Sequence, residues 1–215
     1  MMKTTLTIIL TLTFIAALHS GPNKTEEFKK FFVLAEKFWV DGDYEKSMKA
    51  GLDALKVNPA DHLAYAFVCL NYFEIAELMD SQKYEDEKIR MYETIIEYAN
   101  KGIQANTVSG ECYFMRGIGV GRRSTTVGVF SSLYHAGNVE EDWLKAVDLG
   151  SKYVAPNGER LLAYNYSALS VFYRLCPTFF LIRIVYGIHG DLDKSVEYGK
   201  KAFDLSPDSI PIVKE

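Results

Sequence analysis

Two segments of this chain bring together side chains that suit the binding of a small molecule. Residues 116–135 hold three arginines, a Ser-Thr-Thr run and aromatic side chains, and residues 177–189 are almost entirely apolar, with Arg183 as their sole charge. A segment as apolar as the second must fold into a core, cover a cavity, or face a partner or a lipid. If the two segments lie side by side, they form a cleft for an amphiphilic or anionic small ligand. The residues predicted to contact this ligand are Arg116, Arg122, Arg123, Phe130, Tyr134, Phe179, Phe180, Arg183 and Tyr186.

Residues 177–189 also have a simpler interpretation. They lie near the end of the repeating part of the chain, and the last unit of a helical array needs a cover for its apolar end. Under this alternative their aromatic and aliphatic side chains complete the core, and no cleft forms.

Residue types that catalyse reactions are present, but they are not grouped in catalytic patterns. His62, His135 and His189 stand apart from any serine or cysteine nucleophile motif, and neither HExxH nor GxSxG occurs. Acidic pairs such as Glu140-Glu141 begin predicted helices, where they complement the positive end of the helix dipole. We therefore expect no enzymatic activity and no cofactor.

Four glycines, Gly117, Gly119, Gly121 and Gly128, superficially resemble a nucleotide-binding loop. Such a loop follows a strand and carries a Lys-Ser/Thr pair after its glycines, and this segment has neither. Close helix packing or a bend is the better interpretation.

The three cysteines, Cys69, Cys112 and Cys176, are far apart, and none belongs to a CxxC pair. This spacing predicts small core residues rather than a metal site. A free thiol or one tertiary disulfide is the alternative.

The elements that would position these residues are helical repeats. Residues 42–59, GDYEKSMKAGLDALKVNP, return at 190–207 as GDLDKSVEYGKKAFDLSP. In both copies a Gly-Asp turn opens a helix, small residues lie near its middle, and Pro closes it. A helix patterned in this way must stack against a partner helix and against the next repeat.

The spacing predicts an all-α solenoid of about four helical hairpins with two insertions. The Gly that opens the second helix of the third hairpin is Gly137, thirteen residues later than the pattern requires, so we expect that helix at about 139–153. Gly190 of the fourth hairpin is late by the same number, and residues 177–189 are the inserted stretch. Both insertions are predicted in the turn between the two helices of a hairpin, on one edge of the solenoid, so they should meet.

Composition and the N-terminus place limits on the partners. Residues 1–20 have a lysine, an apolar run and small residues before Pro22, which predicts a signal peptide and an exported, periplasmic or secreted protein. No Cys lies near the cleavage region for lipid attachment. The full chain has net charge −4, and removal of Lys3 makes it more negative, which argues against a nucleic-acid partner. We expect a lead-in at 21–27, one helical domain at 28–208 and a tail at 209–215.

Residues 28–61 resemble the tetratricopeptide repeat (TPR) family. The residues that carry the likeness are Phe31, Leu34, Ala35, Phe38, Gly42, Asp43, Tyr44, Ser47, Ala54, Leu55 and Pro59. A looser likeness is carried by RGIGVGRRSTTVGVFSSL, by GNVEEDWLKAVDLGSKYVAPN, and by YRLCP with GDLDKSVEYGKKAFDLSPD. These strings resemble the T component associated with TRAP transporters, an exported bacterial group.

The second resemblance implies a periplasmic all-α scaffold that partners a substrate-binding protein and helps to deliver small organic ligands. The chain departs from that group in lacking the lipid-attachment cysteine. Two functions follow as hypotheses. The first is a non-enzymatic scaffold for protein–protein interaction that also holds a small amphiphilic ligand between the inserts. The alternative is a structural adaptor in envelope assembly or secretion that binds peptides on its concave face through Tyr65, Asn71, Asn165 and Tyr166. Self-association stays open.

Overall fold

The computed structural model describes residues 22–151, 153–154 and 160–207, and this part of the chain forms helices joined by short connections. The predicted signal peptide and the whole of the predicted tail lie outside it. The helices are α2 (Pro22–Val40), α3 (Tyr44–Val57), α4 (His62–Leu78), α5 (Glu85–Ala105), α6 (Gly110–Val127), α7 (Val129–Leu149), α8 (Leu161–Leu175), α9 (Phe180–Tyr186) and α10 (Leu192–Leu205). No described helix is long and apolar enough to cross a bilayer.

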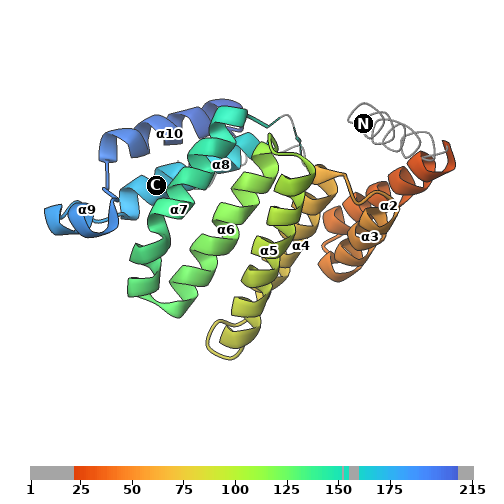
Figure 1. The fold of residues 1–215 in the computed structure, drawn as a ribbon, viewed down its shortest axis with the longest axis horizontal. Helices are drawn as coiled ribbons and strands as arrows, with labels where there is room; N and C mark the ends of the chain where they lie inside the picture. The colour runs from red at the N-terminus through yellow and green to blue at the C-terminus, as the bar shows by residue number, and fades with distance from the viewer. Residues whose placement is uncertain (1–21, 152, 155–159, 208–215) are drawn as a thin grey trace, which may run out of the picture.

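The helices form four hairpins, α2–α3, α4–α5, α6–α7 and α8–α10, which stack in chain order (Figure 1). Helix α3 packs on α4, α5 packs on α6, and α7 packs on α8, so each hairpin buries its apolar face against the next. Short α9 lies between the two helices of the last hairpin along the chain. The prediction of an all-α hairpin solenoid is confirmed.

The repeated Gly-Asp pair begins a helix in both copies, but its glycine is needed for different reasons. Gly42 has φ 77°, a left-handed conformation that glycine adopts without strain. Gly190 instead packs so closely against the carbonyl of Cys176 that a side chain would overlap it. In each copy the following Asp caps the helix: Asp43 accepts from the backbone N–H of Lys46, and Asp191 from that of Lys194.

Two serines confirm that the first and fourth hairpins are equivalent. Ser47 lies five residues after Gly42, and its hydroxyl donates to the carbonyl of Ala35 at 2.7 Å. Ser195 lies five residues after Gly190 and donates to the carbonyl of Ser170 at 2.8 Å. Both bonds join the second helix of a hairpin to the first. The acceptor in the fourth hairpin is thirteen residues further back, as expected for a hairpin with residues 177–189 inserted.

The insertion in the third hairpin does not form the expected enlarged turn. Instead α6 continues to Val127 and α7 begins at Val129, so helix α7 starts ten residues before the predicted one and ends near residue 149. Gly128, with φ 131°, makes the whole turn. The physical reason is that Leu133, Ala136 and Val139 recur at helical spacing and extend the apolar face of α7.

The insertion in the fourth hairpin does lie in a turn, where it forms α9. Helix α9 packs against α7, and the backbone carbonyl of Tyr186 lies near Gly137. Helix α9 therefore lies beside α7 near Gly137, whereas the expected meeting of two enlarged turns does not occur, because the third hairpin has no enlarged turn.

Glycine packing brings α6 close to both of its neighbours. A side chain at Gly117 would overlap the ring of Trp143 on α7, and one at Gly119 would lie about 3 Å from Ile95, Ile96 and the carbonyl of Tyr92 on α5. Close helix packing therefore accounts for these two glycines, and the bend at Gly128 accounts for a third. The cysteines are free thiols, and the full burial of Cys69 and Cys112 confirms that these two are core residues, whereas Cys176 is half-buried.

Candidate functional site

A cavity of about 610 Å³ lies among α4, α6, α7 and α8 and is the candidate binding site. Its walls are built from consecutive hairpins: Phe73 on α4, Ile118 on α6, Leu133 on α7 and Phe172 on α8 are examples. Ile188, which is 1% exposed and follows α9, closes part of the wall. The volume lies within the range of small-molecule sites, and the lining is predominantly aliphatic and aromatic, as in such sites.

The connection between α7 and α8 reaches the first hairpin at one side of this cavity. Tyr153 lines the cavity, packs in a cluster with Ala35 and Phe67, and places its hydroxyl 3.5 Å from Glu36 on α2. Burial raises the pKa of the Tyr153 phenol, which therefore stays protonated and donates to the carboxylate. Burial also raises the pKa of Glu36, an effect that the Tyr153 hydrogen bond opposes.

Each predicted ligand-binding arginine of α6 holds an acidic side chain of another helix. Arg116 contacts both carboxylate oxygens of Asp142 on α7, at 2.8 and 2.5 Å. Arg122 is 2.9 Å from Glu77 on α4, and Arg123 is 2.8 Å from Glu93 on α5. Of the three, only Arg122 also lines the cavity, where it stacks over the ring of Phe73.

Four of the predicted aromatic residues, Phe130, Tyr134, Phe179 and Tyr186, do not line the cavity. Phe130 and Tyr134 are 82% and 73% exposed on α7, and Phe179 is 64% exposed before α9. Tyr186 is half-buried, and the side chain of Phe180 lies outside what the structure describes. These positions leave their predicted contact with a ligand untested. They leave aromatic side chains exposed on α7 and before α9.

Arg183 lines a second, polar cleft of about 320 Å³, and none of the described residues that line this cleft also lines the cavity. The cleft also contains Glu140, Tyr173, His189 and Lys194, which come from α7, α8 and α10 and from the loop after α9. The Tyr173 hydroxyl donates to Glu140 at 2.6 Å, and burial together with this hydrogen bond raises the pKa of Tyr173. A neutral Tyr173 is thereby held as a donor between two hairpins.

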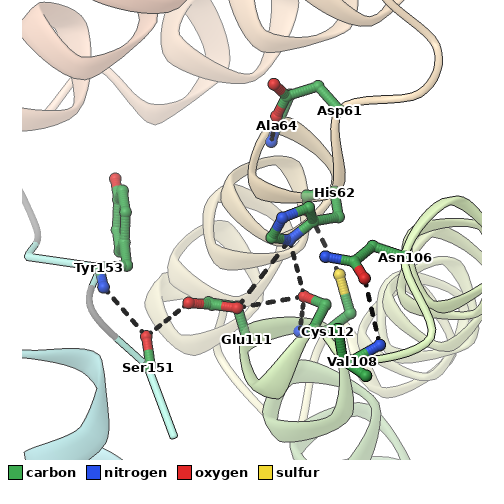
Figure 2. Close-up of polar contacts among 10 residues, drawn as sticks. Asp61, His62, Ala64, Asn106, Val108, Glu111, Cys112, Ser151 and Tyr153 are labelled. Carbon is green, nitrogen blue, oxygen red and sulfur yellow. Dashed lines mark hydrogen bonds and ion pairs between the residues drawn. The ribbon is translucent and has the colours of Figure 1, made fainter. Parts of the chain in front are cut away.

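A third polar cluster joins α4 to α6, and Figure 2 shows its members. His62 Nδ1 lies 2.9 Å from the Ser109 hydroxyl, which lies 3.1 Å from Glu111 Oε2, and Ser151 donates to Glu111 Oε1 at 2.6 Å (Figure 2). Ser109 also caps α6 by accepting from the backbone N–H of Cys112. Ser109 is only 1% exposed, and His62, Ser109 and Glu111 line neither cavity. The serine, histidine and glutamate therefore hold a helix end and a connection in place.

The described residues bear on two further functions, metal binding and peptide binding. They contain no group of three or more His, Cys, Asp or Glu side chains that could hold a metal ion. Asn71 and Asn165, predicted to bind peptides, are 0% and 2% exposed, and their amides donate to the carbonyls of Phe67 and Trp143.

Apart from Arg122, the residues predicted to bind a ligand do not include those that line the cavity in the described structure. Leu133, Ala136 and Val139 were expected in or beside a loop, yet they face the cavity from α7. Their helical spacing was the available signal. It was obscured because the repeat pattern marks Gly137, inside α7, as the start of the helix.

No protein-family model matches this chain, and neither does any curated protein. Among solved structures the chain is similar to one described as the crystal structure of MamA protein, with 14% sequence identity over 87% of this chain and 98% of that chain, at a TM-score of 0.30. A similarity of this size assigns neither a fold nor a function.

Proposed function

We propose that this chain is an exported, non-enzymatic helical-repeat protein of the tetratricopeptide type that holds a mainly apolar small molecule and joins a protein partner. The observation that carries the ligand part is the cavity of about 610 Å³ with aliphatic and aromatic walls. An apolar molecule that enters such a cavity gains roughly 25 cal/mol for each Å² of apolar surface removed from water. The walls come from several hairpins, so occupancy would also join the hairpins to one another.

The partner part of the proposal is supported by apolar side chains left exposed beside α7 and α9. Phe130, Phe179, Ile184 and Val185 are each more than 60% exposed. Grouped apolar side chains on a surface are a common mark of protein contacts. Export and a periplasmic substrate-binding protein as the partner are supported by the N-terminal segment and by the resemblance to the TRAP-associated group. Fractionation of expressing cells tests export. Identification of the proteins that co-purify with the exported chain tests the partner.

The adaptor alternative is less well supported by the geometry. Asn71 and Asn165 are buried and donate to backbone carbonyls, and Tyr166 stacks on Tyr198. A peptide on the concave face would have to displace these contacts before it could use those side chains. The cavity needs no such rearrangement.

A neutral fluorescent probe, N-phenyl-1-naphthylamine, tests the cavity directly. We expect binding with a rise in emission, and we expect Ala136→Phe on the cavity wall to weaken it at least about tenfold, because the ring occupies the ligand volume. Asn138→Phe is the matched control, since it adds the same ring at an exposed position of α7 and should leave probe affinity unchanged. Equal affinity for the two variants would place the probe elsewhere and contradict the cavity assignment.

A further inference from the structure

Two buried polar atoms on the cavity wall have no hydrogen-bond partner among the described residues. They are the indole nitrogen of Trp39 on α2 and the hydroxyl of Ser124 on α6, which is 2% exposed. Nearly all buried polar groups in native proteins are paired, and an unpaired one costs about 1–3 kcal/mol. An indole nitrogen only donates, whereas a hydroxyl both donates and accepts. Both residues line the cavity, but these two atoms have less than 1 Å² of accessible surface, so each can bond a ligand oxygen once its side chain turns toward the cavity.

Among the described residues that line the cavity, no positive charge is left unpaired for an anionic ligand. Arg122 is the basic residue of the described lining, and Glu77 neutralises it at 2.9 Å. Glu77 is itself held by the Tyr92 hydroxyl at 2.8 Å. A carboxylate or phosphate moved into this lining would lose its hydration without gaining an unpaired cation, which is costly.

We propose that the natural occupant is an uncharged, mainly apolar molecule bearing oxygen atoms that bond Trp39 and Ser124, such as a long-chain alcohol, ketone or ester. This inference rests on the proposed function and specifies its ligand. It differs from the anionic or amphiphilic ligand that the arginines suggest in the sequence, because the structure pairs those arginines with acids. An oxygen at each unpaired atom would recover hydrogen bonds that an alkane cannot supply.

The test compares ligands of equal chain length for their ability to displace N-phenyl-1-naphthylamine from the full-length protein at pH 7.5. The ligands are 1-decanol, decanoate and decylammonium. We expect 1-decanol to displace the probe at about one tenth of the concentration that decanoate requires. Ser124→Ala and Trp39→Phe should each weaken 1-decanol about two- to tenfold while probe affinity stays within about twofold.

Ser132→Ala is the matched control, because Ser132 also lines the cavity but its hydroxyl already bonds the carbonyl of Gly128 at 3.0 Å. It should leave 1-decanol affinity unchanged, and helical circular dichroism checks that every variant is folded. If decanoate binds as tightly as 1-decanol, or if both cavity variants bind 1-decanol like the wild type, the inference is wrong while the cavity function stands. If the probe and all three ligands fail to bind, the proposed function itself fails.

Discussion

At the scale of single residues, the three cysteine thiols differ in what surrounds them. Cys69 donates to the carbonyl of Ile95 and Cys112 to that of His62, and both are fully buried. Cys176 is half-buried at the end of α8 and lines the cavity. Burial raises the pKa of Cys112 and that of Cys176 to about 11. Because the thiolate is the reactive form, all three thiols should be slow nucleophiles at neutral pH.

Labelling of the folded protein with Ellman's reagent at pH 8 should show one slow phase, from Cys176, followed by much slower reaction of the other two. A pKa of about 11 leaves roughly 100-fold less thiolate than in free cysteine, so the Cys176 phase should be slower by a similar factor. Cys176→Ser should remove this phase, and unfolding in guanidinium should expose all remaining thiols at once. A Cys176→Ser protein that keeps the first phase would contradict the assignment. Protection by a bound apolar probe would place that probe beside α8.

At the scale of elements, the close approach of α5 and α6 depends on one glycine. A methyl group at Gly119 would lie 2.9 Å from a side-chain carbon of Ile96, 3.0 Å from one of Ile95 and 3.1 Å from the Tyr92 carbonyl. Contacts this short force a neighbour to move. Gly121 lies half a turn further along α6, and a methyl group there would meet Val139 at 3.7 Å, an ordinary packing distance.

These two positions predict opposite effects of the same substitution. Gly119→Ala should lower the free energy of unfolding by about 1–3 kcal/mol, since overpacking against α5 outweighs the gain in helix propensity. Gly121→Ala should raise it by up to about 1 kcal/mol, because the helix gains propensity without a clash. Urea denaturation followed by circular dichroism measures both. If Gly121→Ala lowers the free energy of unfolding as much as Gly119→Ala does, then α6 tolerates no added atom on either face.

At the scale of the whole molecule, a few polar contacts connect hairpins that are far apart in sequence. The guanidinium of Arg116 joins three helices: it holds Asp142 on α7 with two nitrogens and donates to Asn100 on α5 at 3.0 Å. Asp142 is 5% exposed. Burial raises the pKa of Asp142, and the contact with Arg116 opposes that rise. The ion pair therefore joins the two helices of the third hairpin, and the hydrogen bond to Asn100 joins that hairpin to the second.

Arg116→Met should lower the free energy of unfolding by about 3–5 kcal/mol at pH 7.5, because it leaves a buried carboxylate without its cation. Without Arg116 the pKa of Asp142 in the folded variant rises further. In the unfolded variant Asp142 has its ordinary pKa of about 3.9. At a pH between these two pKa values the folded state therefore binds more protons than the unfolded state. Stability of the variant therefore falls as pH rises through that window, and its deficit should shrink at pH 4.5.

Urea denaturation at both pH values, with Arg116→Met/Asp142→Leu as the control, measures this effect. The double variant should recover most of the stability lost at pH 7.5, since it removes the unpaired charge. A single-variant deficit that is the same at pH 4.5 and pH 7.5, or a double variant no more stable than the single, would show that the ion pair does not set the effect.

Much of the fold could be predicted from interactions between residues that are close in sequence. Asp43 and Asp191 cap their helices through backbone groups three residues away, so a Gly-Asp pair before an apolar-periodic run already specifies where a helix begins. The small residues Gly51 and Ala54 likewise predict close packing wherever the helix is placed. Such features depend on neighbours in sequence, and the hairpin solenoid was predicted from them.

The binding site depends on contacts between residues far apart in the chain. Arg116, Arg122 and Arg123 each pair with a carboxylate that lies 26 to 45 positions away in the sequence, and no neighbouring residue indicates this pairing. From the sequence alone the three arginines are therefore interpreted as a basic cluster that binds a ligand. The cavity likewise exists only because α4, α6, α7 and α8 stack at a particular spacing, and because α7 continues as a helix through the inserted stretch. Helix starts follow from local hydrogen bonding, whereas charge compensation and enclosed volume follow from packing among several hairpins.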